Sequence, residues 1–148
     1  MLTPELARIY AALWMLSREA TPPVDPVYWD TRDMQNGARA LFIPPASDGD
    51  VPQIRVARVQ PPDDSEDIPP PDFGGANVRE LISLAHERGH EESWRAKTYE
   101  VRTMSEEHRA WSHAEMLLRA LGFQEWSEFH AHKQDSLDGH RRRGTPER

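Results

Sequence analysis

Two histidines and a glutamate in the second half of the chain have the types and spacing of a metal-dependent hydrolytic site. Residues 86–90 have the sequence His-Glu-Arg-Gly-His, an H-E-x-x-H pattern. On a helix, residues four apart lie about 6 Å apart along the axis, on one face. The imidazoles of His86 and His90 can therefore bind one zinc ion at about 2.0–2.1 Å each. Glu87 lies beside them, where a carboxylate can take a proton from a zinc-activated water as general base.

A catalytic zinc site needs a third protein ligand and an open position. A third histidine six residues after His90 is excluded, because Ala96 occupies that position. Glu107 is the preferred third ligand: it is in helical phase with the apolar residues Trp111 and Leu118, so it should face inward, where a metal would compensate the cost of burying a carboxylate. Glu106 stays open as a competitor, since acids are also favoured in the first turn of a helix.

A hydrolase also needs a group that stabilises the oxyanion. His113 is the first choice, because it lies on the same predicted helix as Glu107, about two turns downstream. The other candidates are Tyr99, His108, His130 and His132. For each of these side chains, an ordinary partly exposed residue is the alternative interpretation.

The elements that would position these residues can be predicted from caps and periodicity. Thr3-Pro4 predicts the start of a helix over 4–19. Two β-rich runs, 38–43 and 53–59, flank a turn cluster and predict neighbouring antiparallel strands. A free edge of the 53–59 strand could bind an extended peptide.

Three further helices are expected in the second half. Asn77, with Glu80 three residues on, predicts the start of the H-E-x-x-H helix, which should run to about residue 94. Ser105 is expected to cap the next helix, and Gly122 to end it in the left-handed conformation. A third, shorter helix should carry Trp126 and Phe129.

Residues 84–90 (Leu-Ala-His-Glu-Arg-Gly-His), followed seventeen residues after His90 by Glu107-x-x-Ala110, resemble the motifs of the ImmA/IrrE-type metallopeptidases, within the gluzincin group. The resemblance covers about 36–122. It implies a minimal zincin-like α+β fold: an N-terminal helix, a small antiparallel sheet, then the H-E-x-x-H helix and a ligand helix. It also implies a glutamate as third zinc ligand, and helix-turn-helix repressors as substrates. The chain departs from the family at Trp111, where Asn is usual, and at Arg88, where an apolar residue is more common.

Length and composition limit the remaining possibilities. The 148 residues suffice for one compact domain, here 1–138, followed by a basic flexible tail over 139–148. Residues 60–76 hold five prolines and five acids and predict a surface loop. The net charge of −7 makes nucleic acid an unlikely partner. The apolar run within 5–16 is too short to cross a membrane and has no signal-peptide features. The absence of cysteine fits a reducing cytoplasm.

The sequence therefore predicts a cytoplasmic zinc peptidase that acts on a protein or peptide substrate. Zn²⁺ would be held by His86, His90 and Glu107, although such a nitrogen–oxygen site could also take manganese or cobalt. One alternative is a non-catalytic, partner-binding regulatory protein with a structural or vestigial zinc site. The other is a helical domain without a metal.

Overall fold

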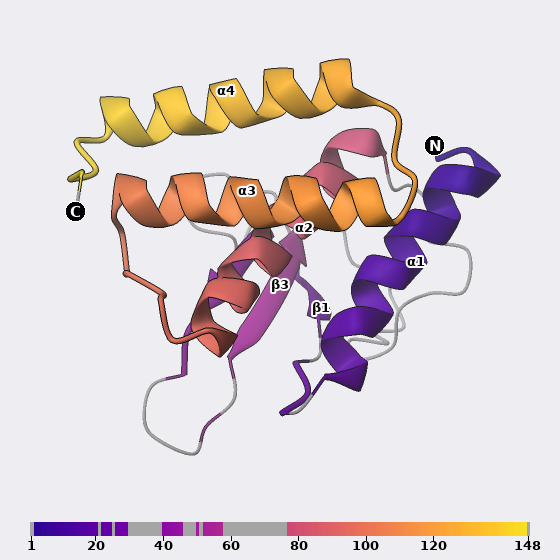
Figure 1. Cartoon of the computed structure of the whole chain (residues 1–148), viewed down its shortest axis with the longest axis horizontal. Helices are drawn as coiled ribbons and strands as arrows, with labels where there is room; N and C mark the ends of the chain where they lie inside the picture. The colour runs from indigo at the N-terminus through magenta and orange to yellow at the C-terminus, as the bar shows by residue number, and fades with distance from the viewer. Residues whose placement is uncertain are drawn as a thin grey trace.

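The computed structural model describes residues 2–20, 22–24, 26–29, 40–45, 50, 52–57 and 77–147. The described chain has an α+β fold, as expected (Figure 1). Its elements are α1 (Pro4–Glu19), β1 (Pro26–Trp29), β2 (Ala40–Ile43), β3 (Gln53–Ala57), α2 (Val78–Arg95), α3 (Met104–Ala120) and α4 (Trp126–Arg142). The predicted acidic loop, 60–76, lies outside the described residues.

The three strands form a small mixed sheet in the order β1-β3-β2. The predicted antiparallel pair is confirmed, with Phe42 of β2 opposite Ile54 of β3. β1 adds a parallel neighbour on the other side of β3, with Tyr28 opposite Val56. The sequence analysis had no strand there. Because β3 is paired on both sides, the expectation that its edge binds a peptide is wrong for residues 53–57, and β2 is the edge strand nearest the site.

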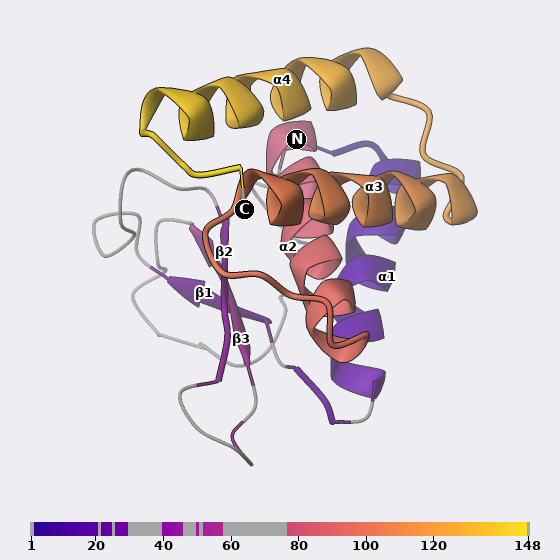
Figure 2. The same ribbon diagram turned by 60° about the vertical axis from the view of Figure 1, so that its left-hand side comes forward.

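α2 is the central element of the molecule. In Figure 2, α2 lies between α1 and the sheet. α3 and α4 also pack against α2. Since neighbours enclose it, its polar side chains are buried together with its apolar ones. The buried polar residues of α2 are Glu80, Ser83, His86, Glu87, Arg88, His90, Glu91 and Ser93. Buried polar groups require partners, and α2 carries most of the buried polar residues in the part of the chain that the structure describes.

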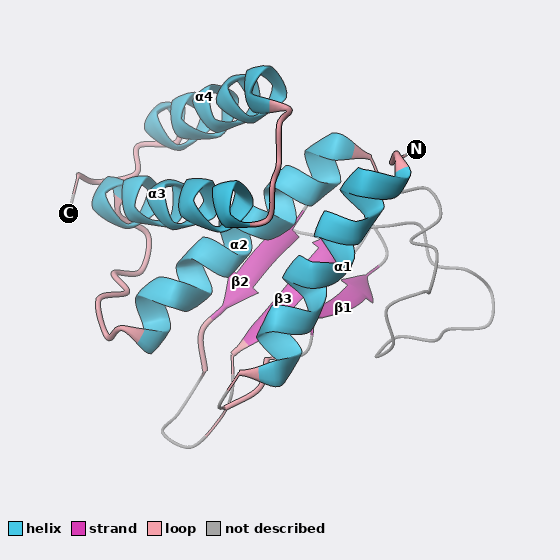
Figure 3. Cartoon of the chain, turned by 45° about the vertical axis from the view of Figure 1, so that its right-hand side comes forward, coloured by secondary structure: helices cyan, strands magenta, loops and turns pink. Residues whose placement is uncertain are grey.

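α1 lies beside α2 (Figure 3), and two buried hydrogen bonds join the two helices. The hydroxyl of Tyr10 donates a hydrogen bond of 2.6 Å to Glu80, and the hydroxyl of Ser17 donates one of 2.7 Å to Glu91. Around them, Ile9 and Leu13 are fully buried, as the helical spacing predicts. The start of α1 is also as predicted, with the Thr3 side chain accepting from the amide of Leu6.

α2 and α3 approach closely where Gly89 faces Ala110. A Cβ atom at Gly89 would lie 2.1 Å from the backbone oxygen of Ala110, which is far inside van der Waals contact. A glycine within a helix costs about 1 kcal/mol relative to alanine. The close approach of the α3 backbone explains why a glycine stands at this position in α2.

The start of α3 differs from the prediction by two residues. The N-cap is Thr103, whose hydroxyl oxygen accepts from the amide of Glu106 at 3.1 Å, and not Ser105. Both residue types are good caps, so local propensity could not separate them. The end is confirmed: Gly122 has a φ of 84°, and the amide of Phe123 donates back to the carbonyl of Leu118 at 3.0 Å, as in a Schellman motif.

α4 is as long as α3 and reaches Arg142, so the domain boundary expected at residue 138 falls inside a helix. Gly144, with a φ of 77°, then turns the chain. The carbonyl oxygens of Pro146 and Glu147 accept hydrogen bonds from the first amides of α3. The expected basic tail is thus helix and cap in the described residues up to 147.

Candidate metal centre

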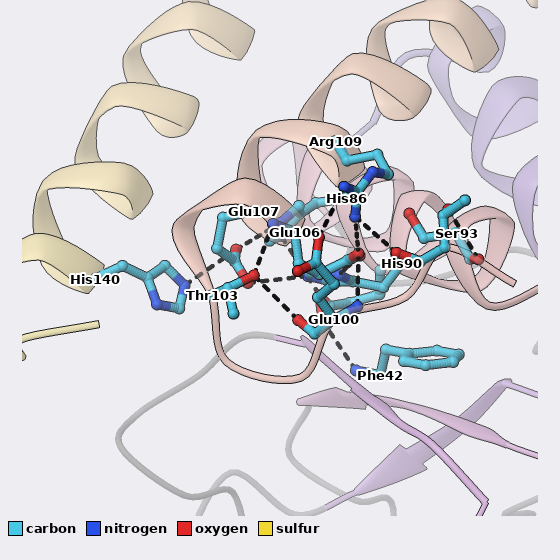
Figure 4. A network of polar contacts seen from close by, with 12 residues as sticks. Phe42, His86, His90, Ser93, Glu100, Thr103, Glu106, Glu107, Arg109 and His140 are labelled. Carbon is cyan, nitrogen blue, oxygen red and sulfur yellow. Dashed lines mark hydrogen bonds and ion pairs between the residues drawn. The ribbon is translucent and has the colours of Figure 1, made fainter. Parts of the chain in front are cut away.

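Three side chains from two helices converge at one point (Figure 4). Candidate ligand atoms of His86, His90 and Glu107 all lie within 4.8 Å of one another. Nε2 of His86 is 3.1 Å from Oε1 of Glu107, and Nε2 of His90 is 3.3 Å from its Oε2. The two histidines come from successive turns of α2, and the glutamate comes from the first turn of α3. The structure thus brings together the three residues predicted to bind the metal.

The adjacent acid, Glu106, points to the other side of His90. Its Oε2 atom accepts a hydrogen bond of 2.7 Å from Nδ1 of His90. Its Oε1 atom accepts from the guanidinium of Arg109 at 2.9 Å and from the amide of Glu100 at 3.3 Å. A carboxylate that holds Nδ1–H leaves Nε2 as the free acceptor, which is how protein carboxylates orient metal-binding histidines. Glu106 is therefore placed as an orienting partner of a ligand.

The donor set fits a divalent metal of the zinc type. Two imidazole nitrogens and one carboxylate form the His₂Glu set known from catalytic zinc sites. Nε2 of His86 and Oε1 of Glu107 are buried, and neither makes a well-formed hydrogen bond within the described residues, although they lie 3.1 Å apart and Oε1 also lies 3.1 Å from Nε2 of His140. Buried polar atoms are costly unless compensated. A cation between these atoms would compensate both.

Electrostatics at the cluster follow from its burial. Burial by itself lowers the pKa of His90, but the hydrogen bonds to Glu106 and Glu107 outweigh that effect and raise the pKa to about 10. Burial opposes ionisation of Glu107, yet its contacts with His140, His86 and His90 hold its pKa well below the usual range. Without a metal, the protonated imidazole of His90 thus supplies positive charge beside Glu107.

Glu87 lies between the histidines and the sheet. Its Oε1 atom accepts a hydrogen bond of 2.9 Å from the backbone amide of Phe42 in β2, and its Oε2 atom is 3.4 Å from Nδ1 of His86. Burial raises the pKa of Glu87, against the lowering effect of the two histidines. Its side chain is therefore fixed in position beside the candidate ligands by a strand that comes from far away in the sequence.

Aromatic rings form the walls of the site. The ring of Trp111 stacks on His86 at 4.2 Å between centroids and 7° between planes, and it is fully buried. Tyr99 meets His90 edge-on at 5.9 Å, and Phe42 lies parallel to His90 at 6.3 Å. Trp111 is therefore a packing residue that fixes the ring of a candidate ligand, as expected for a core tryptophan.

The other predicted site residues differ in where they lie. His113 is half-buried on α3, and no contact between it and the cluster is seen among the described residues. His108 and His130 are exposed, and His132 is 3.0 Å from the hydroxyl of Ser83, away from the candidate ligands. Of the oxyanion candidates, Tyr99 alone lies directly against one of the two histidine ligands.

His140 was missed by the sequence analysis, although its Nε2 atom is 3.1 Å from Oε1 of Glu107. A signal for it exists. His140 continues the α4 face that carries the buried residues Phe129 and Leu137, at helical spacings of +11 and +3. Residues 139–142, expected to belong to a flexible tail, form the last turn of α4, and this turn carries His140.

Comparisons with known proteins identify no relative. No protein-family model matches the sequence, and neither a curated protein nor a solved structure shows a significant match. The function must therefore be argued from the site itself. Among the described helices, none combines the length and the apolar character needed to cross a membrane.

Proposed function

We propose that the protein is a zinc-dependent peptidase that hydrolyses a peptide bond in a protein substrate. The observation that supports this proposal is the convergence of His86, His90 and Glu107, with Glu87 held beside them. The pairing of an H-E-x-x-H helix with a downstream glutamate is the arrangement of the gluzincin class. The substrate proposed from the resemblance is a helix-turn-helix repressor, and the compartment is the cytoplasm.

Each residue has a distinct task in this proposal. His86, His90 and Glu107 hold the metal, which when bound polarises a water molecule and the scissile carbonyl. Glu87 accepts the proton that the attacking water loses and delivers it to the leaving amine. Glu106 keeps His90 in the tautomer whose Nε2 faces the metal position. Tyr99 replaces His113 as the proposed oxyanion-stabilising group, because its ring contacts His90.

The proposed position of the substrate follows from the sheet. β2 has a described neighbour on one side only and carries the Phe42 amide that binds Glu87. An extended peptide added to the outer edge of β2 would pass next to this carboxylate. The substrate strand is therefore proposed at β2.

Glu87→Gln tests the enzymatic role. Glutamine keeps an oxygen for the Phe42 amide but cannot act as a base, so metal content should be unchanged while peptide hydrolysis falls by about 10²–10⁴-fold. The matched control is Glu92→Gln, on the same helix and with a partly exposed side chain. Metal content is measured by elemental analysis and hydrolysis with peptide libraries and candidate repressors. If metal-loaded wild type cleaves neither the libraries nor the repressors and Glu87→Gln behaves identically, the peptidase is ruled out; equal cleavage by both would rule out Glu87 as the base.

A second function is favoured by the low exposure of the ligands. His86, His90 and Glu107 are 9%, 6% and 7% exposed, and structural zinc sites are closed to solvent. The alternative is therefore a non-catalytic regulatory protein that binds its partner and uses the metal to hold α2 and α3 together. It predicts stoichiometric metal, no hydrolysis, and a biological effect that Glu87→Gln preserves.

A further inference from the structure

The end of the described chain returns to the first turn of α3, which carries Glu106 and Glu107. The amide of Met104 donates to the carbonyl of Pro146 at 2.7 Å, and the amide of Ser105 donates to the carbonyl of Glu147 at 3.2 Å. The hydroxyl of Ser105 also donates to the carbonyl of Glu147 at 2.8 Å. The first amides of a helix have no partner within the helix. Here they are satisfied by backbone from the segment 139–147.

The geometry of this segment is set by a Schellman motif at the end of α4. The amide of Gly144 donates to the carbonyl of Arg141, and the amide of Thr145 donates to the carbonyl of His140, both at 3.0 Å. Gly144 adopts a φ of 77°, which glycine accepts without strain. The turn directs residues 145–147 toward the start of α3, while the His140 side chain points from α4 to Glu107 (Figure 4).

The contact between His140 and Glu107 has a defined polarity. Nε2 of His140 lies 3.1 Å from Oε1 of Glu107 as an ion-pair contact, and since a carboxylate only accepts hydrogen bonds, we assign the proton to this nitrogen. Nδ1 of His140 is then the acceptor, and the hydroxyl of Thr145 lies 3.4 Å from it. His140 is not one of the three residues whose ligand atoms lie within 4.8 Å of one another. It contacts a ligand without joining the ligand set.

We propose that residues 139–147 form a latch that positions the third metal ligand: His140 holds the carboxylate of Glu107, and the backbone of Pro146 and Glu147 fixes the helix turn that carries it. The inference rests on the proposed metal site. Outer partners of metal ligands typically change metal affinity by about 10–100-fold when they are removed. His140 is thus a positioning residue, and the last turn of α4 belongs to the site.

The test is metal affinity together with the visible spectrum of the Co²⁺-loaded full chain. His140→Ala should weaken Zn²⁺ and Co²⁺ binding by about 10–100-fold, and leave the Co²⁺ spectrum at saturation unchanged, because the ligand set is the same. His140→Gln retains an N–H donor and should recover affinity to within a few-fold of wild type. His130→Ala, an exposed histidine on the same helix, is the control and should bind as wild type does.

Gly144→Ala tests the latch without touching the site. No atom lies within 4 Å of the added Cβ, so the substitution acts through the positive φ, which costs about 1–2 kcal/mol in residues other than glycine. Metal affinity should fall by about 5–30-fold, which is the same free energy expressed as a binding ratio.

The outcomes separate the two proposals. A wild-type protein that binds no stoichiometric metal overturns the metal centre and the latch together. Wild-type binding with unchanged affinity in His140→Ala overturns the latch alone. A changed Co²⁺ spectrum in His140→Ala would make His140 a direct ligand and would also overturn the positioning role.

Discussion

At the residue scale, the adjacent acids Glu106 and Glu107 have different tasks because consecutive helix residues point about 100° apart. Glu107 faces the Nε2 atoms of both histidines, and Glu106 faces Nδ1 of His90. The two carboxylates therefore lie on opposite sides of the His90 ring. In the proposed metal site, one would bind the metal and the other would orient a ring that binds it.

This division predicts different effects of the same substitution at neighbouring positions. Glu107→Gln should lose stoichiometric zinc, because a neutral amide replaces the charged ligand. Glu106→Gln should retain one zinc per chain with affinity weakened by about 10–100-fold. Competition titration against a chromogenic chelator measures both, with Glu115→Gln on the same helix as control. The reverse order of effects would assign the ligand to Glu106.

At the element scale, the position of Glu107 depends on how closely α3 lies against α2. The contact is backbone to backbone at Gly89 and Ala110. A methyl group there has no room, so it must push α3 away from the histidines. Gly139 of α4 is different, since the nearest atoms to a Cβ there are the ends of the Arg143 and Arg142 side chains, at 3.2 and 3.8 Å.

The two glycines are expected to respond in opposite ways to alanine. Gly89→Ala should destabilise the protein by about 1–3 kcal/mol or more, because overpacking outweighs the gain in helix propensity. It should also weaken metal binding. Gly139→Ala should leave the free energy of unfolding unchanged or raise it by up to about 1 kcal/mol. Urea denaturation of metal-free protein measures both; a stabilising Gly89→Ala would contradict the close contact.

A network of ion pairs lies on α2, and a hydrogen bond from Ser17 joins it to α1. Glu91 is fully buried and lies 2.8 Å from Arg88 and 2.7 Å from Arg95, and it also accepts from Ser17. Glu92 meets the same Arg88 at 2.8 Å, but its side chain is 37% exposed. Arg88, unusual at its position for the resembled family, thus forms ion pairs with two acids on its own helix.

The exposed fraction of each acid should determine how much free energy of unfolding is lost when the acid is removed. Glu91→Ala leaves the buried guanidinium of Arg88 without its inner partner and should cost about 3–5 kcal/mol. Glu92→Ala removes a partly exposed ion pair and should cost less than about 1 kcal/mol. Denaturant unfolding of the two variants provides the comparison. Similar losses in both would show that the network contributes little through burial.

At the scale of the whole molecule, the candidate metal centre connects elements that are otherwise held by packing. Its ligands come from α2 and α3, and its supporting contacts come from β2 and α4. A ligand that binds only the folded state stabilises it by about 2.7 kcal/mol at one hundred times its Kd. Metal should therefore act on the stability of the whole fold.

Metal loading is expected to raise the thermal midpoint by about 5–10 °C at that concentration of free Zn²⁺, given the usual scaling for chains of this size. Calorimetry before and after adding zinc measures the shift, and a chelator should reverse it. His86→Ala, which lacks a ligand, is the control and should show no rise. A rise of equal size in His86→Ala would assign the effect to zinc bound elsewhere.

Local interactions, which the sequence carries directly, determined much of this protein. The i, i+4 spacing placed His86 and His90 on one face, and caps and glycines set the start of α1 and the end of α3. The helical spacing of Glu107 relative to Trp111 and Leu118 predicted its inward direction for the same reason. These features depend on neighbours within about one or two helix turns.

Only the tertiary structure decided the rest, because it depends on contacts between distant segments. The Phe42 amide on Glu87, the Glu106 carboxylate on His90 and the His140 imidazole on Glu107 each join different elements. His113 has the right residue type and lies on the right helix, but its position on α3 does not bring it into contact with the cluster. A helical pattern specifies which residues share a face, and the packing of α2, α3, α4 and β2 specifies which of those faces meet.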